Sequence, residues 1–186
     1  MNIEWSQVTS GAGLAAKKCD VGMGAMTITD ERKKAIGISD PCMNATQVLL
    51  VKKGAPYKSL ADLKGKKVGV QASTTGQKFA DDQAKKYGFT VVVFNDLSLE
   101  TNNVKSGRVD AGINDNGVLY DFVKDNPDTQ VTAEFNTGER YGFATKLNDA
   151  NGEKLLTRLN AVLAKAKSDG TYDTLFKKWF GTEATS

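Results

Sequence analysis

The feature that most constrains the fold of this chain is a regular alternation of short apolar runs and helix-forming segments over residues 59–135. The apolar runs are rich in β-branched residues and typical of buried strands, whereas two of the intervening segments end at glycine, as helices do. The expected strands are 68–72, 90–94, 109–114 and 131–135, and the expected helices are 75–87, 97–106 and 117–124. This alternation predicts a parallel sheet with helices on both faces.

The flanking segments contain the same kinds of element. We expect a short amphipathic helix over 10–18, helical turns over 30–35 and 61–64, and strands over 20–26, 36–39, 48–53 and 141–146. The chain then turns helical, with apolar residues on one helical face up to Gly170. A last helix over 172–180 is rich in aromatic residues, which we interpret as core packing.

Composition excludes several functions. The 186 residues are 40% hydrophobic and 25% charged, which is ordinary for a globular protein. The net charge of +3 is spread along the chain, so we expect no nucleic-acid partner. There is no histidine, the commonest general base and metal ligand, and we expect no metal, no cofactor and no catalytic residue.

The two cysteines, Cys19 and Cys42, are too far apart in sequence for a redox C-x-x-C pair. Either a disulfide or two buried thiols fits the sequence. No apolar run is long enough to span a bilayer, and the start M-N-I-E-W has no features of a secretory signal.

A first candidate half-site lies in A-M-T-I-T-D-E-R, residues 25–32. Thr27 offers a hydroxyl and a backbone N–H at the end of a strand. Arg32 offers a planar guanidinium that can hold a carboxylate by two parallel hydrogen bonds. On spacing alone, a solvated arginine that balances Asp30 or Glu31 is the more frequent arrangement.

A second candidate half-site is V-G-V-Q-A-S-T-T-G-Q, residues 68–77. A strand leads through a hydroxyl-rich turn into a helix, whose first N–H groups lack intrahelical partners and favour an anion. Thr74 and Thr75 lie where these groups converge. Simple capping of the helix by Ser73 or Thr74 would give the same pattern.

The third element is N-D-N, residues 114–116, at the end of an expected strand. Ligands of open α/β sheets bind at the carboxyl ends of the strands, so Asp115 could take an ammonium group. Capping of the helix that follows is an equally good interpretation of this aspartate, and both roles are compatible.

These residues fall within four motifs that resemble the solute-binding proteins of polar amino acid ABC importers, of the glutamine/glutamate/arginine type. The motifs are G-A-M-T-I-T-D-E-R-K-K-A-I-G-I-S-D-P, S-L-A-D-L-K-G-K-K-V-G-V-Q, V-K-S-G-R-V-D-A-G-I-N-D and S-D-G-T-Y-D-T-L-F-K-K-W-F-G. They occur in the family's order and cover nearly the whole chain.

The resemblance implies a periplasmic-binding-protein-like II fold, with two Rossmann-like α/β lobes joined by two hinge strands. Lobe 1 is expected to comprise residues 1–43 and 137–186, and lobe 2 residues 45–136. The hinges are expected near 42–46 and 137–141.

The resemblance also implies roles for single residues. Thr27 and Arg32 would hold the α-carboxylate of an amino acid, with the backbone of Thr75. Asp115 would hold the α-ammonium, with Thr27 and the carbonyl of Ala25. The remaining two positions, Gln71 and Thr74, would line the side-chain pocket.

The chain departs from the family pattern at its start. Family members begin with a strand, an aromatic loop, a helix and a second strand, whereas the first residues of this chain, near W-S-Q, match a later part of that pattern. An incomplete lobe 1 would leave sheet edges and apolar faces uncovered. We therefore expect weakened ligand binding and a homo-oligomer, formed by exchange of elements between protomers.

The expected function is to bind an L-amino acid outside the cytoplasm, in the periplasm or at the cell surface, and deliver it to an ABC permease. This is a binding function and not an enzymatic one. Three alternatives remain open: an oligomeric fragment that binds no ligand, a dehydratase on the same fold, and the ligand-sensing domain of a receptor.

Overall fold

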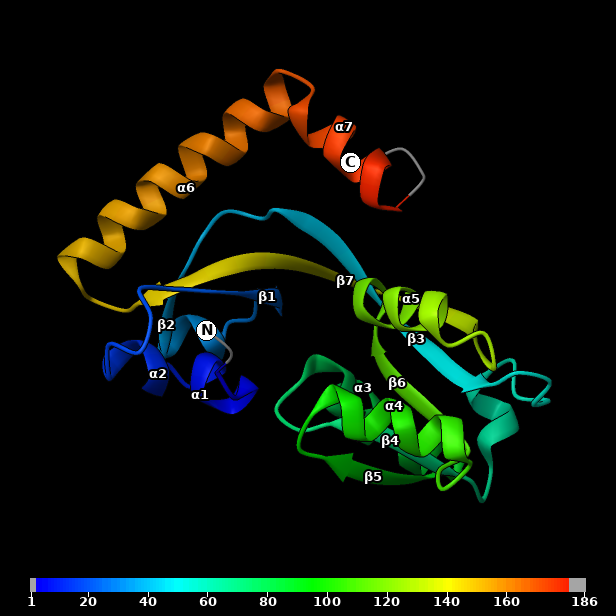
Figure 1. Cartoon of the computed structure of the whole chain (residues 1–186). Coiled ribbons are helices and arrows are strands. Elements are labelled where there is room, and N and C mark those ends of the chain that lie inside the picture. Colours follow the sequence, from blue (N-terminus) through cyan, green and yellow to red (C-terminus); the bar gives the residue numbers. More distant parts are fainter. Residues whose placement is uncertain (1–2, 181–186) are drawn as a thin grey trace. The chain divides into compact units, whose positions relative to one another are not determined.

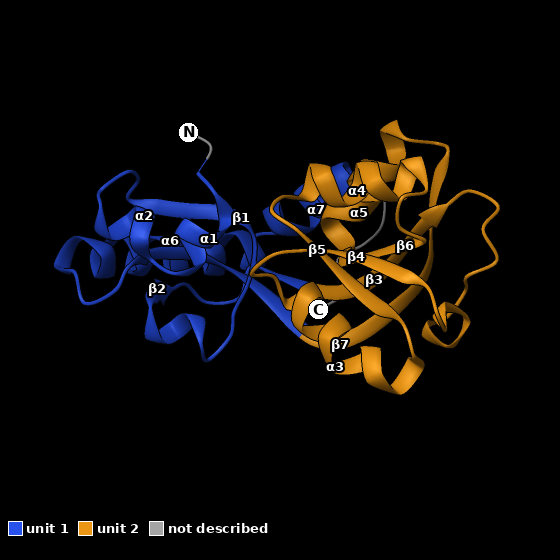
Figure 2. Cartoon of the chain, turned by 90° about the horizontal axis from the view of Figure 1, so that it is seen from below, with its two compact units in different colours: residues 1–44, 139–186 blue, residues 45–138 orange. Residues whose placement is uncertain are grey.

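The computed structural model describes residues 3–180, and the chain divides into two compact units (Figure 2). Unit 1 comprises Met1–Asn44 and Glu139–Ser186, and unit 2 comprises Ala45–Gly138. Two strands, β3 (Met43–Lys52) and β7 (Thr129–Lys146), each begin in one unit and end in the other.

Unit 2 is built on a mixed sheet with the strand order β7-β3-β6-β4-β5 (Figure 1). The crossover helices α3 and α4 make β4 (Lys67–Gln71), β5 (Thr90–Phe94) and β6 (Ala111–Asp115) parallel. The parallel pairing predicted from the alternating run is confirmed for these three strands, and β3, which enters from unit 1 without such a crossover, adds an antiparallel pairing to β6.

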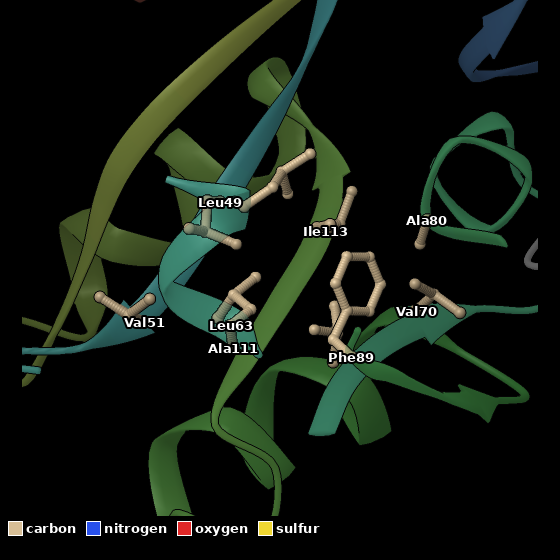
Figure 3. Close-up of a cluster of buried hydrophobic side chains, with 10 residues drawn as sticks. Leu49, Val51, Leu63, Val70, Ala80, Phe89, Ala111 and Ile113 are labelled. Carbon is tan, nitrogen blue, oxygen red and sulfur yellow. The ribbon is translucent and has the colours of Figure 1, made fainter. Parts of the chain in front are cut away.

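Alternating side chains of the strands form two cores in unit 2, one on each face of the sheet. On β3, Leu49 and Val51 face one core and Val48 and Leu50 face the other, and all four are fully buried. Figure 3 shows the first core, where Phe89 lies between the strands and helix α3. These cores form a rigid frame around the end of β6.

The helices of unit 2 begin and end where their sequence signals predict. Helix α3 (Thr75–Tyr87) is capped by the Thr74 hydroxyl, and α4 (Leu97–Ser106) by the Asp96 carboxylate. Both end at a glycine in the left-handed conformation, which a residue with a side chain adopts only with strain. The third helix is α5 (Asn116–Asp125), and a 3-10 turn, η2, spans Leu60–Leu63.

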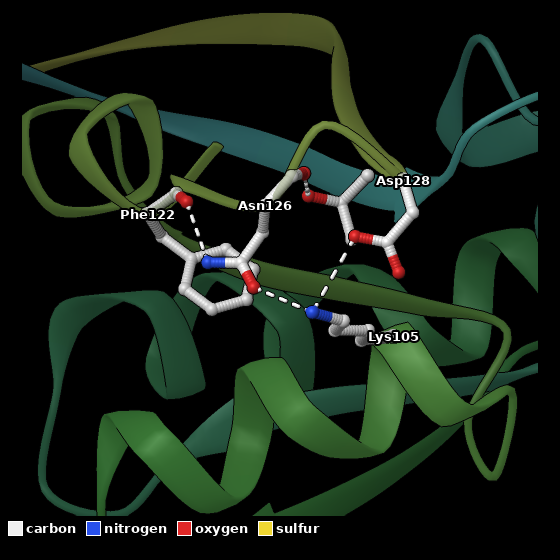
Figure 4. A network of polar contacts seen from close by, with 5 residues as sticks. Lys105, Phe122, Asn126 and Asp128 are labelled. Carbon is white, nitrogen blue, oxygen red and sulfur yellow. Dashed lines mark hydrogen bonds and ion pairs between the residues drawn. The ribbon is translucent and has the colours of Figure 1, made fainter. Parts of the chain in front are cut away.

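A polar network ties the end of α4 to the turn between α5 and β7 (Figure 4). Lys105 Nζ donates to Asn126 Oδ1 over 2.8 Å and pairs with Asp128 Oδ1 at 3.5 Å. Asn126 Nδ2 donates to the Phe122 carbonyl, which satisfies one of the last carbonyls of α5. The two helices on this face are thereby joined by side chains as well as by the core.

Unit 1 is a smaller sheet in which two strands pair antiparallel to the end of β7. These strands are β1 (Val21–Thr27) and β2 (Ile36–Ile38), with the 3-10 turn η1 (Arg32–Lys34) between them. The expected strands 131–135 and 141–146 are one continuous strand, β7, so the turn expected between them is absent. Within β7, Gly138 has a φ of +69°, a left-handed conformation that glycine adopts readily.

Four helices complete unit 1: α1 (Trp5–Thr9), α2 (Ala12–Ala15), α6 (Ala150–Ser168) and α7 (Thr171–Phe180). The single helix predicted over 10–18 is wrong. Gly11 separates α1 from α2 with a φ of +76°, and a Cβ there would lie 2.7 Å from the Ala35 carbonyl oxygen. Neither helix is therefore able to extend through this position.

The aromatic residues of α7 stack on one another rather than in a core. Ring centroids lie 6.0 Å apart for Tyr172 and Phe176 and 4.7 Å apart for Phe176 and Phe180. None of the described residues of α7 is buried, and Trp179 is 66% exposed, so the interpretation as core packing is wrong. Within residues 3–180, no helix is long and apolar enough to cross a membrane.

Candidate functional site

The half-site of unit 1 is formed by β1 and the turn that follows it. Arg32 Nη1 donates to the Thr27 carbonyl oxygen over 2.8 Å, and the Thr27 hydroxyl donates to Glu139 Oε2 over 2.7 Å. Thr27 is 2% exposed and Arg32 is 8% exposed. The guanidinium also lies over the Trp5 ring, 5.3 Å from its centroid.

Arg32 does not adopt the more frequent arrangement, in which a solvated side chain balances Asp30 or Glu31. Its side chain is buried, and Asp30 pairs instead with Lys33 at 3.3 Å. A buried guanidinium with a carbonyl and an aromatic face as neighbours is held in one orientation, as recognition of a planar carboxylate requires.

Ala25 lies in an irregular part of β1, where the register with β7 shifts between Gly22 and Met26. Its φ is +53°, a left-handed conformation that alanine rarely adopts. Ser73 has the same unusual conformation in unit 2, with a φ of +61°, directly before Thr74. Each half-site thus contains one non-glycine residue in a strained backbone conformation, a feature that clusters at binding sites.

The half-site of unit 2 centres on Asp115, the last residue of β6, which is 5% exposed. Its Oδ1 atom accepts a hydrogen bond of 2.6 Å from Gln47 Nε2, and the same nitrogen lies 3.4 Å from the Thr75 hydroxyl. Asp115 stands at the N-cap position of α5, but its side chain does not cap that helix. The sequence allowed Asp115 either to hold an ammonium group or to cap the next helix, and the structure shows no cap by its side chain.

The other predicted residues of unit 2 lie at the turn between β4 and α3. The Thr74 hydroxyl accepts from the Gln77 N–H over 3.0 Å and donates to the Gln71 carbonyl over 2.7 Å. Capping by Thr74 is therefore confirmed. The turn places Gln71, Thr74 and Thr75 at one end of the sheet, and Gln47 connects Thr75 to Asp115.

Three residues of this half-site were missed by the sequence interpretation of site roles: Gln47, Glu100 and Asn114. Gln47 pairs with Asp115 across β3 and β6 and is fully buried. Glu100, on α4, is also fully buried and accepts a hydrogen bond of 2.7 Å from Asn114 Nδ2. Neither Gln47 nor Glu100 stands out by itself, since a glutamine in a strand and a glutamate in a helix are ordinary residues.

Burial raises the pKa of Glu100 well above its ordinary value. The hydrogen bond from Asn114 opposes this rise and the negative charge of Asp115 adds to it. Burial thus favours the protonated form of this carboxyl group. Across the part of the chain that the structure describes, no group of three or more histidine, cysteine, aspartate or glutamate residues could hold a metal ion.

Both cysteines are free thiols, and each is partly buried in unit 1. Burial raises the pKa of the Cys42 thiol, which makes its reactive thiolate form scarcer. The sequence allowed either a disulfide or two thiols at Cys19 and Cys42, and the structure contains two thiols.

The chain has an α/β fold with a buried arginine, Arg32, in one unit and a buried strand-end aspartate, Asp115, in the other. Residues 1–182 match the family of bacterial extracellular solute-binding proteins, family 3. The chain belongs to this family, as its motifs indicate, and the fold that the resemblance implies is confirmed.

Two curated relatives illustrate the similarity. The chain is 40% identical over 163 residues to the ABC transporter glutamine-binding protein GlnH of Bacillus subtilis, a match covering 86% of this chain and 57% of that protein. It is 35% identical over 170 residues to the ABC transporter arginine-binding protein 1 of Escherichia coli, covering 90% and 68%. The chain thus spans little more than half the length of the first relative.

Solved structures give the same result. An ancestral arginine-binding protein bound to arginine matches with a TM-score of 0.85 at 40% identity, over 97% of this chain and 79% of that one. The same kind of ancestral protein bound to glutamine matches with a TM-score of 0.86. The ancestral amino acid-binding protein AncCDT-1, a precursor of cyclohexadienyl dehydratase, matches at 0.80 and 35% identity.

Proposed function

We propose that this chain binds an L-amino acid and delivers it to an ABC importer outside the cytoplasm. Asp115 holds the α-ammonium group, and Arg32 and Thr27 hold the α-carboxylate. The carbonyl of Ala25 assists with the ammonium, and the backbone of Thr75 assists with the carboxylate.

The observation that carries this proposal is the position of the Asp115 carboxylate. It lies at the end of a buried strand, almost without exposure, and is oriented by the side-chain amide of Gln47 at 2.6 Å. A neutral donor fixes the direction of a carboxylate without changing its charge. Such a carboxylate is suited to a cationic group that arrives with the ligand.

The family supports an extracytoplasmic location and an amino acid as the ligand. We propose that units 1 and 2 act as the two lobes, with hinges near 42–46 and 137–141, and that ligand contacts from both lobes favour a closed form. Gln71 lines the side-chain pocket, and the hydroxyl of Thr74 holds the turn in which both residues lie.

The chain acts as a binding protein rather than as an enzyme in this proposal. The similarity to a precursor of a dehydratase gives the enzymatic alternative its support. A dehydratase needs a general acid or base that reaches the substrate. Glu100 has a raised pKa, but its side chain on α4 is fully buried and has no exposed surface to offer a ligand.

We further propose that the chain forms a homo-oligomer through unit 1. Large apolar side chains of that unit are strongly exposed, among them Met23 at 70%, Val162 at 66% and Trp179 at 66%. Exposed apolar patches favour association. Sedimentation at high micromolar concentration checks this, and a well-folded monomer at that concentration would contradict it.

A thermal-shift screen with the twenty amino acids at millimolar concentration tests the proposed function. A ligand at 100 times its dissociation constant adds about 2.7 kcal/mol to the free energy of unfolding, which raises Tm by several degrees. We expect Asp115→Asn to abolish the shift. The matched control is Asp121→Asn, an exposed aspartate on α5 that pairs only with Lys124 among the contacts described. A cooperative melt without any shift would contradict the proposal.

A further inference from the structure

Glu100 is a carboxylic acid buried where an apolar side chain would serve packing better. It lies on α4, a helix that contacts strands β4, β5 and β6 of the sheet (Figure 1), and none of its surface is exposed. Its Oε1 atom has no hydrogen-bond partner of good geometry among the described residues, although the Gln71 backbone N–H also acts on the carboxyl group. Burial of an incompletely satisfied carboxyl group destabilises a fold, so packing alone does not explain this residue.

Two glycines of the sheet lie next to this side chain. Gly69 on β4 and Gly112 on β6 are paired directly across the sheet. A Cβ at Gly112 would lie 3.0 Å from Val104 Cγ2 and 3.1 Å from Glu100 Oε1, whereas a Cβ at Gly69 would meet Phe94 and Val109 before Glu100 Cγ at 3.6 Å. The absence of a side chain at Gly112 therefore leaves room for the carboxyl group.

The carboxyl group is connected to Asp115 through one residue. Asn114 Nδ2 donates to Glu100 Oε2 over 2.7 Å, and Asn114 Oδ1 accepts from the Asp115 N–H over 2.9 Å. Because successive residues of a strand point to opposite faces, Asn114 faces α4 while Asp115 faces Gln47. The connection thus runs through the sheet, from its α4 face to the proposed ammonium site.

We propose that Glu100 is a positioning residue for the ammonium site, acting through Asn114 on Asp115. This inference rests on the proposed function of Asp115. Glu100 fixes the orientation of the Asn114 amide, and that amide fixes the backbone of Asp115 from one face of the sheet. Gln47 fixes the Asp115 carboxylate from the other face, so that two buried side chains hold one ligand-binding residue.

Three variants separate positioning from packing. Glu100→Leu keeps the apolar volume and removes the acceptor for Asn114, whereas Glu100→Gln keeps an oxygen acceptor in the same place. Thr101→Val is the matched control, because Thr101 is buried on the same helix and its hydroxyl bonds only within that helix. We expect Glu100→Leu to weaken amino-acid binding about tenfold, and the other two variants to stay within about threefold of the unchanged protein.

A double-mutant cycle with Asp115→Asn identifies the route of the effect. If Glu100 acts through Asp115, Glu100→Leu weakens binding in the unchanged protein and has little further effect beside Asp115→Asn. Additive effects would overturn the inference while leaving the proposed function intact. If Asp115→Asn itself leaves the affinity unchanged, the proposed function fails.

Hydrogen exchange of the Asp115 amide gives a test that needs no ligand. That N–H is held by Asn114 Oδ1, so we expect Glu100→Leu to speed its exchange while Glu100→Gln and Thr101→Val leave it slow. Unchanged exchange of the Asp115 amide in Glu100→Leu would overturn the inference whatever the binding data show.

Discussion

The two units hold their half-sites in different ways. In unit 2, apolar clusters cover both faces of the sheet, and side chains such as Leu50 and Ile113 have no exposed surface. In unit 1, the described core cluster consists of Leu14, Met26, Ile36 and Ala144. The half-site of unit 1 is fixed chiefly by polar contacts, whereas Asp115 stands on a large apolar frame.

This difference indicates where each half-site is vulnerable. Apolar burial supplies most of the stability of a domain, at about 25 cal/mol per Å². Unit 2 should therefore depend most on its packing. Unit 1 should respond more to changes of single hydrogen bonds, such as that between Thr27 and Glu139.

The largest expected effect compares one buried leucine in each unit. Leu50→Ala should lower the free energy of unfolding by about 4 kcal/mol, because it leaves a cavity between strand and helices. Leu14→Ala, in a four-residue helix of unit 1, should lower it by about 2 kcal/mol, because Leu14 belongs to the smaller core cluster of that unit. Urea unfolding followed by circular dichroism checks both values.

The two tryptophans, Trp5 and Trp179, lie in unit 1, so their fluorescence reports on that unit alone. In Leu50→Ala, the urea concentration at the midpoint of unfolding should fall less when it is measured by fluorescence than when it is measured by circular dichroism. An equal loss of stability in the two leucine variants would break the comparison.

A methyl group added near the residues that hold Asp115 tests whether the packing of unit 2 controls amino-acid binding. In Gly76→Ala, the new Cβ would lie 2.9 Å from both Gln47 Oε1 and the Ile113 carbonyl oxygen. We expect a loss of about 2 kcal/mol and weaker amino-acid binding, because Gln47 must move. Gly152→Ala in unit 1, where a Cβ would lie 2.6 Å from the Lys146 carbonyl oxygen, should destabilise without changing affinity. Calorimetric titration and thermal melts measure the two properties, and unchanged affinity in Gly76→Ala would contradict the expectation.

The pH dependence of stability should differ between the units, beginning with Glu100. Burial raises the pKa of Glu100 in the folded state. Below the unfolded pKa of about 4.3, the carboxyl group is protonated in both states, and its burial lowers the free energy of unfolding least. Stability is then lost as pH rises from the unfolded pKa toward the higher folded pKa. Glu100→Gln should remove this loss, so the stability of the variant relative to the unchanged protein should increase over that range, as measured by urea unfolding. A constant difference over that range would contradict the expectation.

The smallest expected effects come from helix caps. Thr74→Ala in unit 2 should cost about 1 kcal/mol at every pH, because a hydroxyl does not titrate. Asp149 caps α6 in unit 1, and the Gly152 N–H is the main cause that lowers its pKa. Its contribution should be present above the unfolded pKa, about 3.9, and be lost as pH falls through the lowered folded value. Thermal melts of Thr74→Ala and Asp149→Ala at pH 3 and 7 check this, and a pH-independent effect of Asp149→Ala would contradict it.

Much of unit 2 follows from local sequence. The strand Thr90–Phe94 and the helices Thr75–Tyr87 and Leu97–Ser106 have the predicted bounds, because β-branched runs, caps and terminal glycines act within a few residues. Strand direction depends on distant parts of the chain. The antiparallel pairing of β3 and the continuity of β7 were therefore beyond local patterns.

The candidate site divides in the same way. Asp115 could be singled out because the ends of strands bind ligands in open sheets. Gln47 could not, since its position opposite Asp115 is a matter of strand register. One signal could have indicated Glu100: Gly69 and Gly112 interrupt strands, and a glycine inside a strand often marks the close approach of another group.

The central claim is that Asp115 recognises the ammonium group of an amino acid. Calorimetric titration with the amino acid found in the screen, and with its counterpart that lacks the α-amino group, tests this most directly. The unchanged protein should bind the amino acid at least about 100-fold more tightly than the counterpart, and Asp115→Asn should lose most of this discrimination. Equal discrimination by the protein and by Asp115→Asn would contradict the account.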